Sequence, residues 1–280
     1  MKRPLRFAAC NEIFGRRTLA ESCRILRETG YTGIEIAPFT LAPDPTTLDA
    51  SERAAVRDTI AAHDLEFVGL HWILAAPAGL HATSADKEQR ERTWRALDAF
   101  LDLSADLNAK PEHSTVIVFG SPKQRGTMPG VTPEQAREMM RDGLARLAPH
   151  AEERNVQILL EPLSKAQCDV VNTLAEAVAI VSEIGSAAIQ TMFDVHNAAD
   201  ETLAHTELLR RYWPHIRHIH VNEMDGREPG QGDYDFAPLL STLEALDYHR
   251  WVSLEAFDFS RDPREVVAGA FTHLTQLQLL

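Results

Sequence analysis

The segment ILLEP (residues 158–162) is a short apolar run that ends on a glutamate, and three later segments repeat this pattern. These segments are IQTMFDVH (189–196), IRHIHVNE (216–223) and WVSLEAF (251–257). Apolar runs of this length are typical of strands that are buried on both faces of a parallel sheet, so the polar residue that ends each run is expected at the rim of the sheet. The four end residues are Glu161, Asp194, His220 and Glu255.

Outside these segments the chain alternates short apolar runs with longer amphipathic stretches, which is the pattern of βα units. Strands are expected at residues 5–10, 33–37, 66–71, 115–120, 156–161, 189–194, 216–221 and 251–256. Helices are expected at residues 18–29, 50–63, 87–108, 133–154, 173–184, 238–246 and 263–279. Thr132 followed by Pro133 marks a helix start, with Gln135 in the first turn. Eight strands separated by helices predict a single (β/α)8 barrel domain over residues 1–280.

Composition excludes several classes of protein. The chain has 28 Lys and Arg against 41 Asp and Glu, a net charge of −13, which would repel a nucleic-acid backbone and offers no attraction to an anionic membrane. The three cysteines have no CxxC spacing and predict neither a disulfide framework nor a thiolate zinc site. The apolar run in the first residues, MKRPLRFAACNEIFGRR, is too short for a signal peptide, so we expect a cytoplasmic protein.

The four strand-end residues predict a metal site. Active sites of such barrels form at the carboxyl ends of the strands, and these residues end the fifth to eighth expected strands. Each of them alone would more often cap the next helix, but together they form an arc of ligands. Three carboxylates and one imidazole without a thiolate favour Mn²⁺, with Mg²⁺, Co²⁺ or Zn²⁺ also possible.

Further polar residues have two interpretations each. His71 ends the third expected strand and is interpreted as a pocket residue rather than a histidine satisfied beneath a loop. Glu35 either contacts substrate or pairs with a basic neighbour low in the barrel. Lys123 is interpreted as a solvated loop lysine, although an anionic substrate would also suit it. His218 lies two residues before His220 on the same strand face, which favours a position one layer deeper in the core.

The chain resembles the xylose isomerase-like barrel superfamily, and within it the ketose 3-epimerases and hydroxypyruvate isomerase-like enzymes. The resemblance covers nearly the whole chain, and its specific motifs lie between Glu161 and Glu255. The stretch EPLSKAQCDVVNT (161–173) is similar to the family's Glu-x-Leu-Asn-Arg-x-Glu-x-x-x-x-Asn-Thr, with Asn172 on its asparagine. The resemblance implies that Glu161, Asp194, His220 and Glu255 bind Mn²⁺ or a similar ion.

The resemblance also implies substrate contacts, although some of these residues differ from those of the family. Gln167 stands where ketose 3-epimerases have a second glutamate, and DVHN (194–197) replaces Asp-Thr-Phe-His, so that either His196 or Asn197 would polarise a substrate oxygen. Arg227, in VNEMDGREPGQGDYDF (221–236), is expected to be the substrate-binding arginine. With His71, these residues complete the expected substrate site.

The expected reaction is the isomerisation or epimerisation of a ketose or keto-sugar. With the carbonyl on the ion, Glu161 and Glu255 would act as two acid/bases at the adjacent carbon. A lyase that eliminates from 3-keto-glycosides would use the same chemistry and stays open. An apurinic endonuclease-like barrel is disfavoured by the charge and by GDYDF (232–236) in place of the family's Asp-x-His pair, and a non-catalytic sugar-binding barrel would not need both glutamates.

The particular sugar and the stereochemical outcome are not predicted by the sequence. Without a Gly-rich phosphate loop, the sugar is expected to be unphosphorylated. A homo-oligomer is possible, but the sequence does not predict its size.

Overall fold

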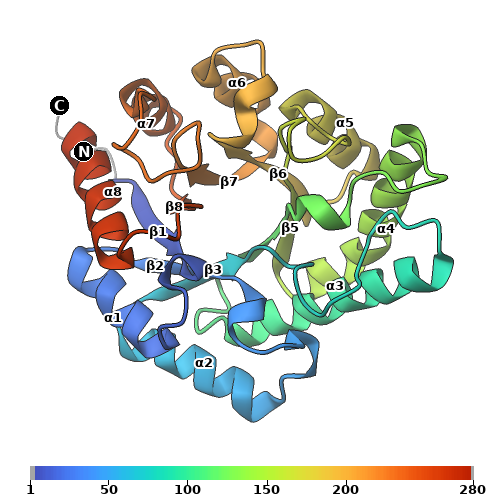
Figure 1. Cartoon of the computed structure of the whole chain (residues 1–280), viewed down its shortest axis with the longest axis horizontal. Coiled ribbons are helices and arrows are strands. Elements are labelled where there is room, and N and C mark those ends of the chain that lie inside the picture. The colour runs from blue at the N-terminus through green and yellow to red at the C-terminus, as the bar shows by residue number, and fades with distance from the viewer. Residues whose placement is uncertain (1–3, 279–280) are drawn as a thin grey trace.

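A computed structural model describes residues 4–278 and shows a closed barrel of eight parallel strands surrounded by eight α-helices (Figure 1). The strands are β1 (Arg6–Cys10), β2 (Gly33–Ile36), β3 (Glu66–Leu70), β4 (Thr115–Phe119), β5 (Val156–Leu160), β6 (Ile189–Asp194), β7 (Ile216–Val221) and β8 (Trp251–Leu254). The helices are α1 (Leu19–Thr29), α2 (Ala50–Ala62), α3 (Lys87–Leu107), α4 (Pro133–Glu153), α5 (Leu174–Ile184), α6 (His205–Tyr212), α7 (Phe236–Ala245) and α8 (Pro263–Gln278). Pairing of β1 with β8, Arg6 opposite Trp251, closes the sheet. The predicted (β/α)8 architecture is confirmed.

Four helices begin with a reciprocal capping box at Thr18, Asp49, Thr132 or Thr173. In each, the cap side chain accepts a hydrogen bond from the backbone amide three residues on, which satisfies an otherwise unpaired donor. At α4, Pro133 is the first helical residue and the Gln135 amide lies 3.2 Å from the Thr132 hydroxyl, so the predicted helix start is confirmed. No helix within residues 4–278 combines the length and the hydropathy needed to cross a lipid bilayer.

Some predicted boundaries were wrong. Five strands end one or two residues early, because rim residues such as Glu161 and Glu255 turn out of the ladder after one last backbone bond each, to Phe119 at 3.4 Å and to Val221 at 3.3 Å. Strand β1 begins one residue later than predicted. Helix α7 begins at Phe236 rather than at 238, because Asp235 caps it. Helix α6 was not predicted; it has only eight residues and no side-chain cap. The predicted end of α8 at 279 lies outside the described residues.

The barrel interior is apolar on one side and polar on the other. Alternation along the strands separates an inner apolar cluster from the larger core between barrel and helices. The inner cluster consists of Ala8, Val68, Val116, Val118, Leu159 and Met192. Strands β2 and β7 instead turn Glu35, His218 and His220 inward, all at most 1% exposed. This polar column ends at the carboxyl rim, where the candidate site lies.

Candidate metal centre and active site

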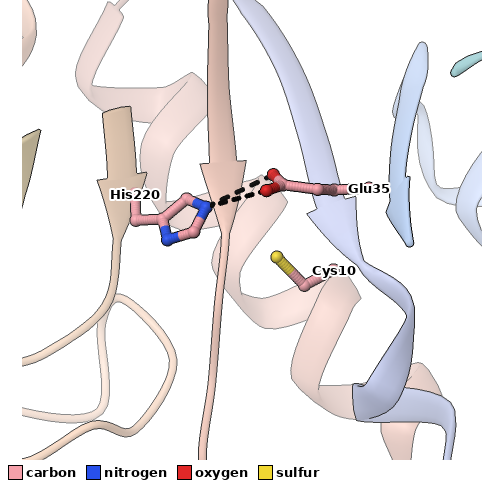
Figure 2. A group of neighbouring side chains, drawn as sticks. All are labelled: Cys10, Glu35 and His220. Atoms are coloured by element: carbon pink, nitrogen blue, oxygen red, sulfur yellow. Dashed lines mark hydrogen bonds and ion pairs between the residues drawn. The ribbon is translucent and has the colours of Figure 1, made fainter. Parts of the chain in front are cut away.

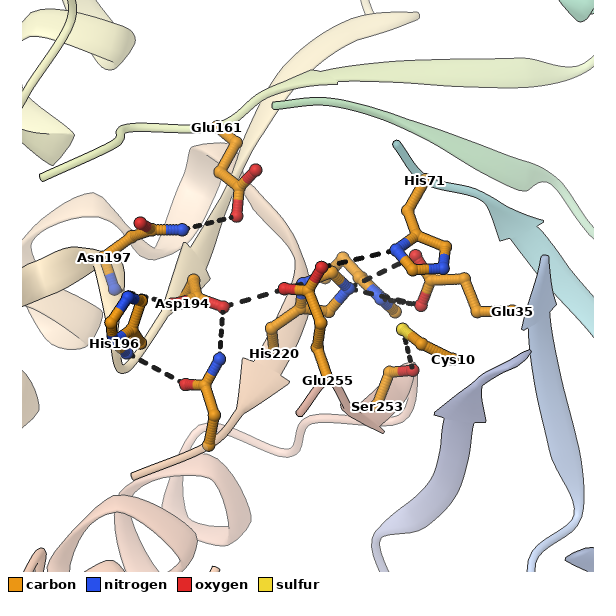
Figure 3. A network of polar contacts seen from close by, with 12 residues as sticks. Cys10, Glu35, His71, Glu161, Asp194, His196, Asn197, His220, Ser253 and Glu255 are labelled. Carbon is orange, nitrogen blue, oxygen red and sulfur yellow. Dashed lines mark hydrogen bonds and ion pairs between the residues drawn. The ribbon is translucent and has the colours of Figure 1, made fainter. Parts of the chain in front are cut away.

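At the carboxyl end of the barrel, consecutive strands bring together four side chains that could bind a metal: Glu161, Asp194, His220 and Glu255 (Figure 3). Glu161 follows β5, Asp194 ends β6, His220 lies in β7 and Glu255 follows β8. All four are buried, and one potential ligand atom of each lies within 4.8 Å of those of the others. The parallel pairing of β6 with β7 explains this proximity, because its register places Asp194 directly beside His220.

Hydrogen bonds hold these side chains in place. Glu255 Oε2 lies 3.0 Å from His220 Nδ1, and Asp194 Oδ2 lies 3.6 Å from the same nitrogen. Asn222 Nδ2 donates to Asp194 Oδ2 at 3.1 Å. The backbone amide of Asn197 donates to Asp194 Oδ1 at 2.7 Å, and its side-chain amide donates to Glu161 Oε1 at 3.0 Å. Two asparagines therefore orient the carboxylates toward one point.

The electrostatics of the cluster set its two glutamates apart. Burial, followed by the charges of Glu255 and Asp194, raises the pKa of Glu161 to about 8. Burial also opposes ionisation of Glu255, but His220 and His71 outweigh it and hold its pKa well below the usual range. Without a cation, the cluster therefore stabilises a protonated Glu161 beside an ionised Glu255.

These residues fit a hard or borderline divalent cation. Burial is the largest cause of the raised pKa of Glu161, and the neighbouring carboxylates of Glu255 and Asp194 add to it; a +2 ion among these groups would offset both effects. Carboxylate oxygens and one imidazole nitrogen suit Mn²⁺, Mg²⁺ or Co²⁺, and four protein ligands leave positions open on an octahedral ion. Beside such an ion, the carboxylates could also accept and return protons.

Three of the predicted substrate residues lie around this cluster. His71 is fully buried, with Nε2 at 2.8 Å from Glu12 and Nδ1 at 3.4 Å from Glu255 Oε1. Gln167 Nε2 donates to Asn197 Oδ1 at 2.9 Å, which continues the network that reaches Glu161. His71 thus contacts Glu255, Asn197 contacts Glu161, and Gln167 contacts Asn197.

The other two predicted substrate residues are not brought into the cluster. His196 points toward the β7–α7 loop, where its Nδ1 lies 2.8 Å from the carbonyl oxygen of Met224. Arg227 is 41% exposed and forms an ion pair with Asp225 at 2.7 Å. Asn172 has a structural role, because its side chain donates to the backbone carbonyls of Leu163 and Cys168.

Two buried ionisable residues near the site were not predicted. Arg125, in the β4–α4 loop, is 0% exposed and donates from Nη2 to the backbone carbonyl of Glu161 at 2.6 Å, while its Nε and Nη1 have no hydrogen-bond partner among the described residues. Glu12, just after β1, is 5% exposed and contacts His71. No sequence pattern marks either residue: Glu12 lies in a short 3-10 helix (Asn11–Phe14) and Arg125 in a loop, and the burial of both depends on the tertiary fold.

The contacts of Glu35 decide between its two interpretations, a substrate contact or a pair with a basic neighbour. Its carboxylate lies between His218 Nε2 at 2.9 Å and His220 Nε2 at 3.2 Å, so it pairs with basic neighbours inside the barrel. Burial raises the pKa of the nearby Cys10 thiol to about 12. Although Cys10, Glu35 and His220 lie close enough to be considered as a second ion site (Figure 2), a thiol that stays protonated is a poor metal ligand.

A hollow of about 350 Å³ lies beside the network that joins Gln167 to Glu161. It is lined by residues of the loops after β4 and β5, including Lys123, Lys165 and Gln167. Lys123 is exposed, as expected for a loop lysine, and it faces this hollow. The hollow offers room for a part of a substrate that extends away from the four ligand residues.

Comparison with known proteins gives a consistent family. A family model described as xylose isomerase-like TIM barrel matches residues 23–277. The chain is 24% identical over 275 residues to a 3-dehydro-D-guloside 4-epimerase of Escherichia coli (strain K12), covering 94% of this chain and 97% of that protein. It is 24% identical to an L-ribulose 3-epimerase of Methylomonas sp. (strain DH-1), over 86% of this chain and 78% of the relative.

A solved structure of a 3-keto-D-glucoside 4-epimerase from E. coli superposes with a TM-score of 0.81 at 21% identity, over 99% of this chain and 100% of that one. At this identity the likeness concerns the fold alone.

Proposed function

The chain belongs to the xylose isomerase-like TIM barrel family, and we propose that it is a divalent-metal-dependent epimerase of a ketose or keto-sugar. The observation that carries the proposal is the presence of two glutamates, Glu161 and Glu255, in one buried cluster with Asp194 and His220. Relatives named as epimerases of an L-ketose and of a dehydro-glycoside support this substrate class.

The cluster would hold one ion, with Mn²⁺ as the proposed metal. When bound, the ion would polarise a substrate carbonyl and stabilise the negative charge that develops on its oxygen. The protein then has to move a proton at the neighbouring carbon. Glu161 and Glu255 follow strands that are separated by β6 and β7, so they would approach that carbon from different sides. Removal of the proton by one carboxylate and donation of a different proton by the other would invert the carbon.

Hydrogen bonds hold both glutamates in place for this transfer. One has to be ionised to remove the proton and the other protonated to donate one, and the two exchange these roles between the forward and the reverse reaction. Trp72 Nε1 donates to Glu255 Oε1 at 2.8 Å and fixes the orientation of that carboxylate. Asn197 fixes Glu161 in the same way.

Aromatic rings on one side of the site support a sugar as the substrate. The Trp72 ring lies 5.9 Å from that of Phe39 and 6.2 Å from that of Phe257. These rings form an apolar wall beside Glu255, against which the C–H face of a sugar can pack and from which water is excluded. Phe39 is 37% exposed, so the wall extends to the surface.

A substrate panel tests the proposal. The Mn²⁺-loaded protein is incubated with free ketoses and with 3-keto-glycosides, and each mixture is analysed by NMR for new stereoisomers. An epimer of at least one compound, absent after chelation and restored by Mn²⁺, is expected. Release of the aglycone without an epimer would instead establish the lyase reaction on 3-keto-glycosides. If no compound is converted although Mn²⁺ binds, the proposed activity is wrong.

A further inference from the structure

Glu35 lies inside the barrel with both carboxylate oxygens directed at His220 of β7 (Figures 2 and 3). His218 Nε2 lies 2.9 Å from Oε2, and His220 Nε2 lies 3.2 Å from Oε1 and 3.3 Å from Oε2. All three side chains are at most 1% exposed. A buried carboxylate is tolerated only with such partners, because an unpaired one would be strongly destabilising. The contact therefore fixes one edge of the His220 ring.

That contact determines which nitrogen of His220 carries a hydrogen. An ionised carboxylate can only accept hydrogen bonds, so the His220 nitrogen that faces Glu35 must be the donor. Without a cation, the ionised Glu255 accepts from Nδ1 in the same way, so a bound cation has to replace the hydrogen on Nδ1. The neutral ring that remains has its one N–H on Nε2, facing Glu35, and its lone pair on Nδ1. Nδ1 is the nitrogen that faces Glu255 at 3.0 Å and Asp194 at 3.6 Å.

We propose that Glu35 is a positioning residue that keeps the hydrogen of His220 on Nε2 and so presents the Nδ1 lone pair to the metal cluster. This inference rests on the cation site of the proposed function. It adds a residue of β2, on the far side of β1 and β8 from His220, to the residues that determine metal affinity. Outer carboxylates of this kind typically change metal affinity by about 10- to 100-fold when they are removed.

Glu35→Gln is the informative variant, because it keeps the shape of the side chain. Its amide can donate as well as accept, so the hydrogen of His220 is free to move to Nδ1, where it would block the metal. His218→Gln is the matched control, since its amide can still donate to Glu35 and it leaves the contact between Glu35 and His220 in place. We expect Glu35→Gln to bind Mn²⁺ about 10- to 100-fold more weakly by calorimetry, and His218→Gln to bind like the wild type.

Loss of a negative charge would by itself weaken cation binding, so the deciding measurement is the state of the ring. Long-range ¹H–¹⁵N NMR of histidine-labelled protein, loaded with diamagnetic Zn²⁺ or Mg²⁺, is expected to show hydrogen on Nε2 of His220 in the wild type and in His218→Gln. In Glu35→Gln a fraction with hydrogen on Nδ1 is expected.

Wild-type protein alone can overturn the inference, even if Glu35→Gln fails to fold: hydrogen on Nδ1 of His220 in the loaded protein contradicts it. A folded Glu35→Gln protein with unchanged Mn²⁺ affinity and with hydrogen only on Nε2 of His220 would also contradict it. The proposed epimerase function would not be affected by that result. Conversely, the wild-type protein could show hydrogen on Nε2 of His220 and still convert no sugar. That result would contradict the proposed function but would support the role of Glu35.

Discussion

Gly120, the residue directly after β4, leaves the space that the Glu161 carboxylate occupies. A Cβ at Gly120 would overlap Glu161 Oε2 and lie 3.3 Å from its Cδ. The backbone of Gly120 is not in the left-handed region, so alanine is conformationally allowed there and the clash with Glu161 is the main consequence. Gly120→Ala would therefore push Glu161, one of the two proposed acid/bases, out of position while leaving the barrel intact.

We expect a large loss of catalytic rate in Gly120→Ala. A displacement of about 1 Å of a catalytic group can lower the rate by about 100-fold, which corresponds to about 2.7 kcal/mol of transition-state stabilisation. We expect kcat of Gly120→Ala to fall by this factor, with weaker Mn²⁺ binding and an unchanged far-UV circular dichroism spectrum. Gly269→Ala in α8 is the control, because its Cβ would have no neighbouring atom within 4 Å; it should keep full activity. Wild-type kcat and Mn²⁺ affinity in Gly120→Ala would refute the assigned position of Glu161.

Four further predictions concern the same cluster. Glu161→Gln and Glu255→Gln are each expected to stay folded and to lose about 10²- to 10⁴-fold in kcat, and an active Glu255→Gln enzyme would rule out two-base transfer. Because the folded-state pKa of Glu161 is raised from 4.5 to about 8, the metal-free protein should lose stability as pH rises between these values, measured by thermal unfolding. Over the upper part of the same window, calorimetry should show tighter Mn²⁺ binding with proton release, since Glu161 must ionise to bind; affinity that does not change with pH would contradict the assignment. Chelation should lower the melting temperature and abolish turnover, both restored by Mn²⁺ in excess, because a ligand at 100 times its Kd stabilises the folded state by about 2.7 kcal/mol.

The sequence predicted the barrel and its metal-ligand candidates because both depend on local patterns. Buried strands appear as apolar runs, and Asp194 and His220 are recognisable because each lies at the end of such a run. In a parallel barrel all these ends meet at one rim, so their proximity follows from the topology. Helix α6 has only eight residues and no side-chain cap to mark its start, and it was missed.

The support around the ligands could not be predicted, because it comes from contacts between distant segments. Arg125 reaches the carbonyl of Glu161 from an irregular loop, and Glu35 meets His220 across the barrel interior, 185 positions away in the chain. The motif around Arg227 predicts a substrate contact, which stays a prediction; in the structure its side chain pairs with its neighbour Asp225. Such side-chain directions depend on loop conformation rather than on local sequence.

The central claim is proton transfer by Glu161 and Glu255 at the carbon beside a carbonyl, and solvent exchange tests it most directly. The Mn²⁺-loaded protein is incubated in D₂O with a ketose or 3-keto-glycoside that it converts, and the product is analysed by NMR. The account predicts that each new epimer carries deuterium at the inverted carbon, and that neither glutamine variant forms the deuterated epimer at the wild-type rate. An epimer that forms in D₂O with its original hydrogen would contradict it.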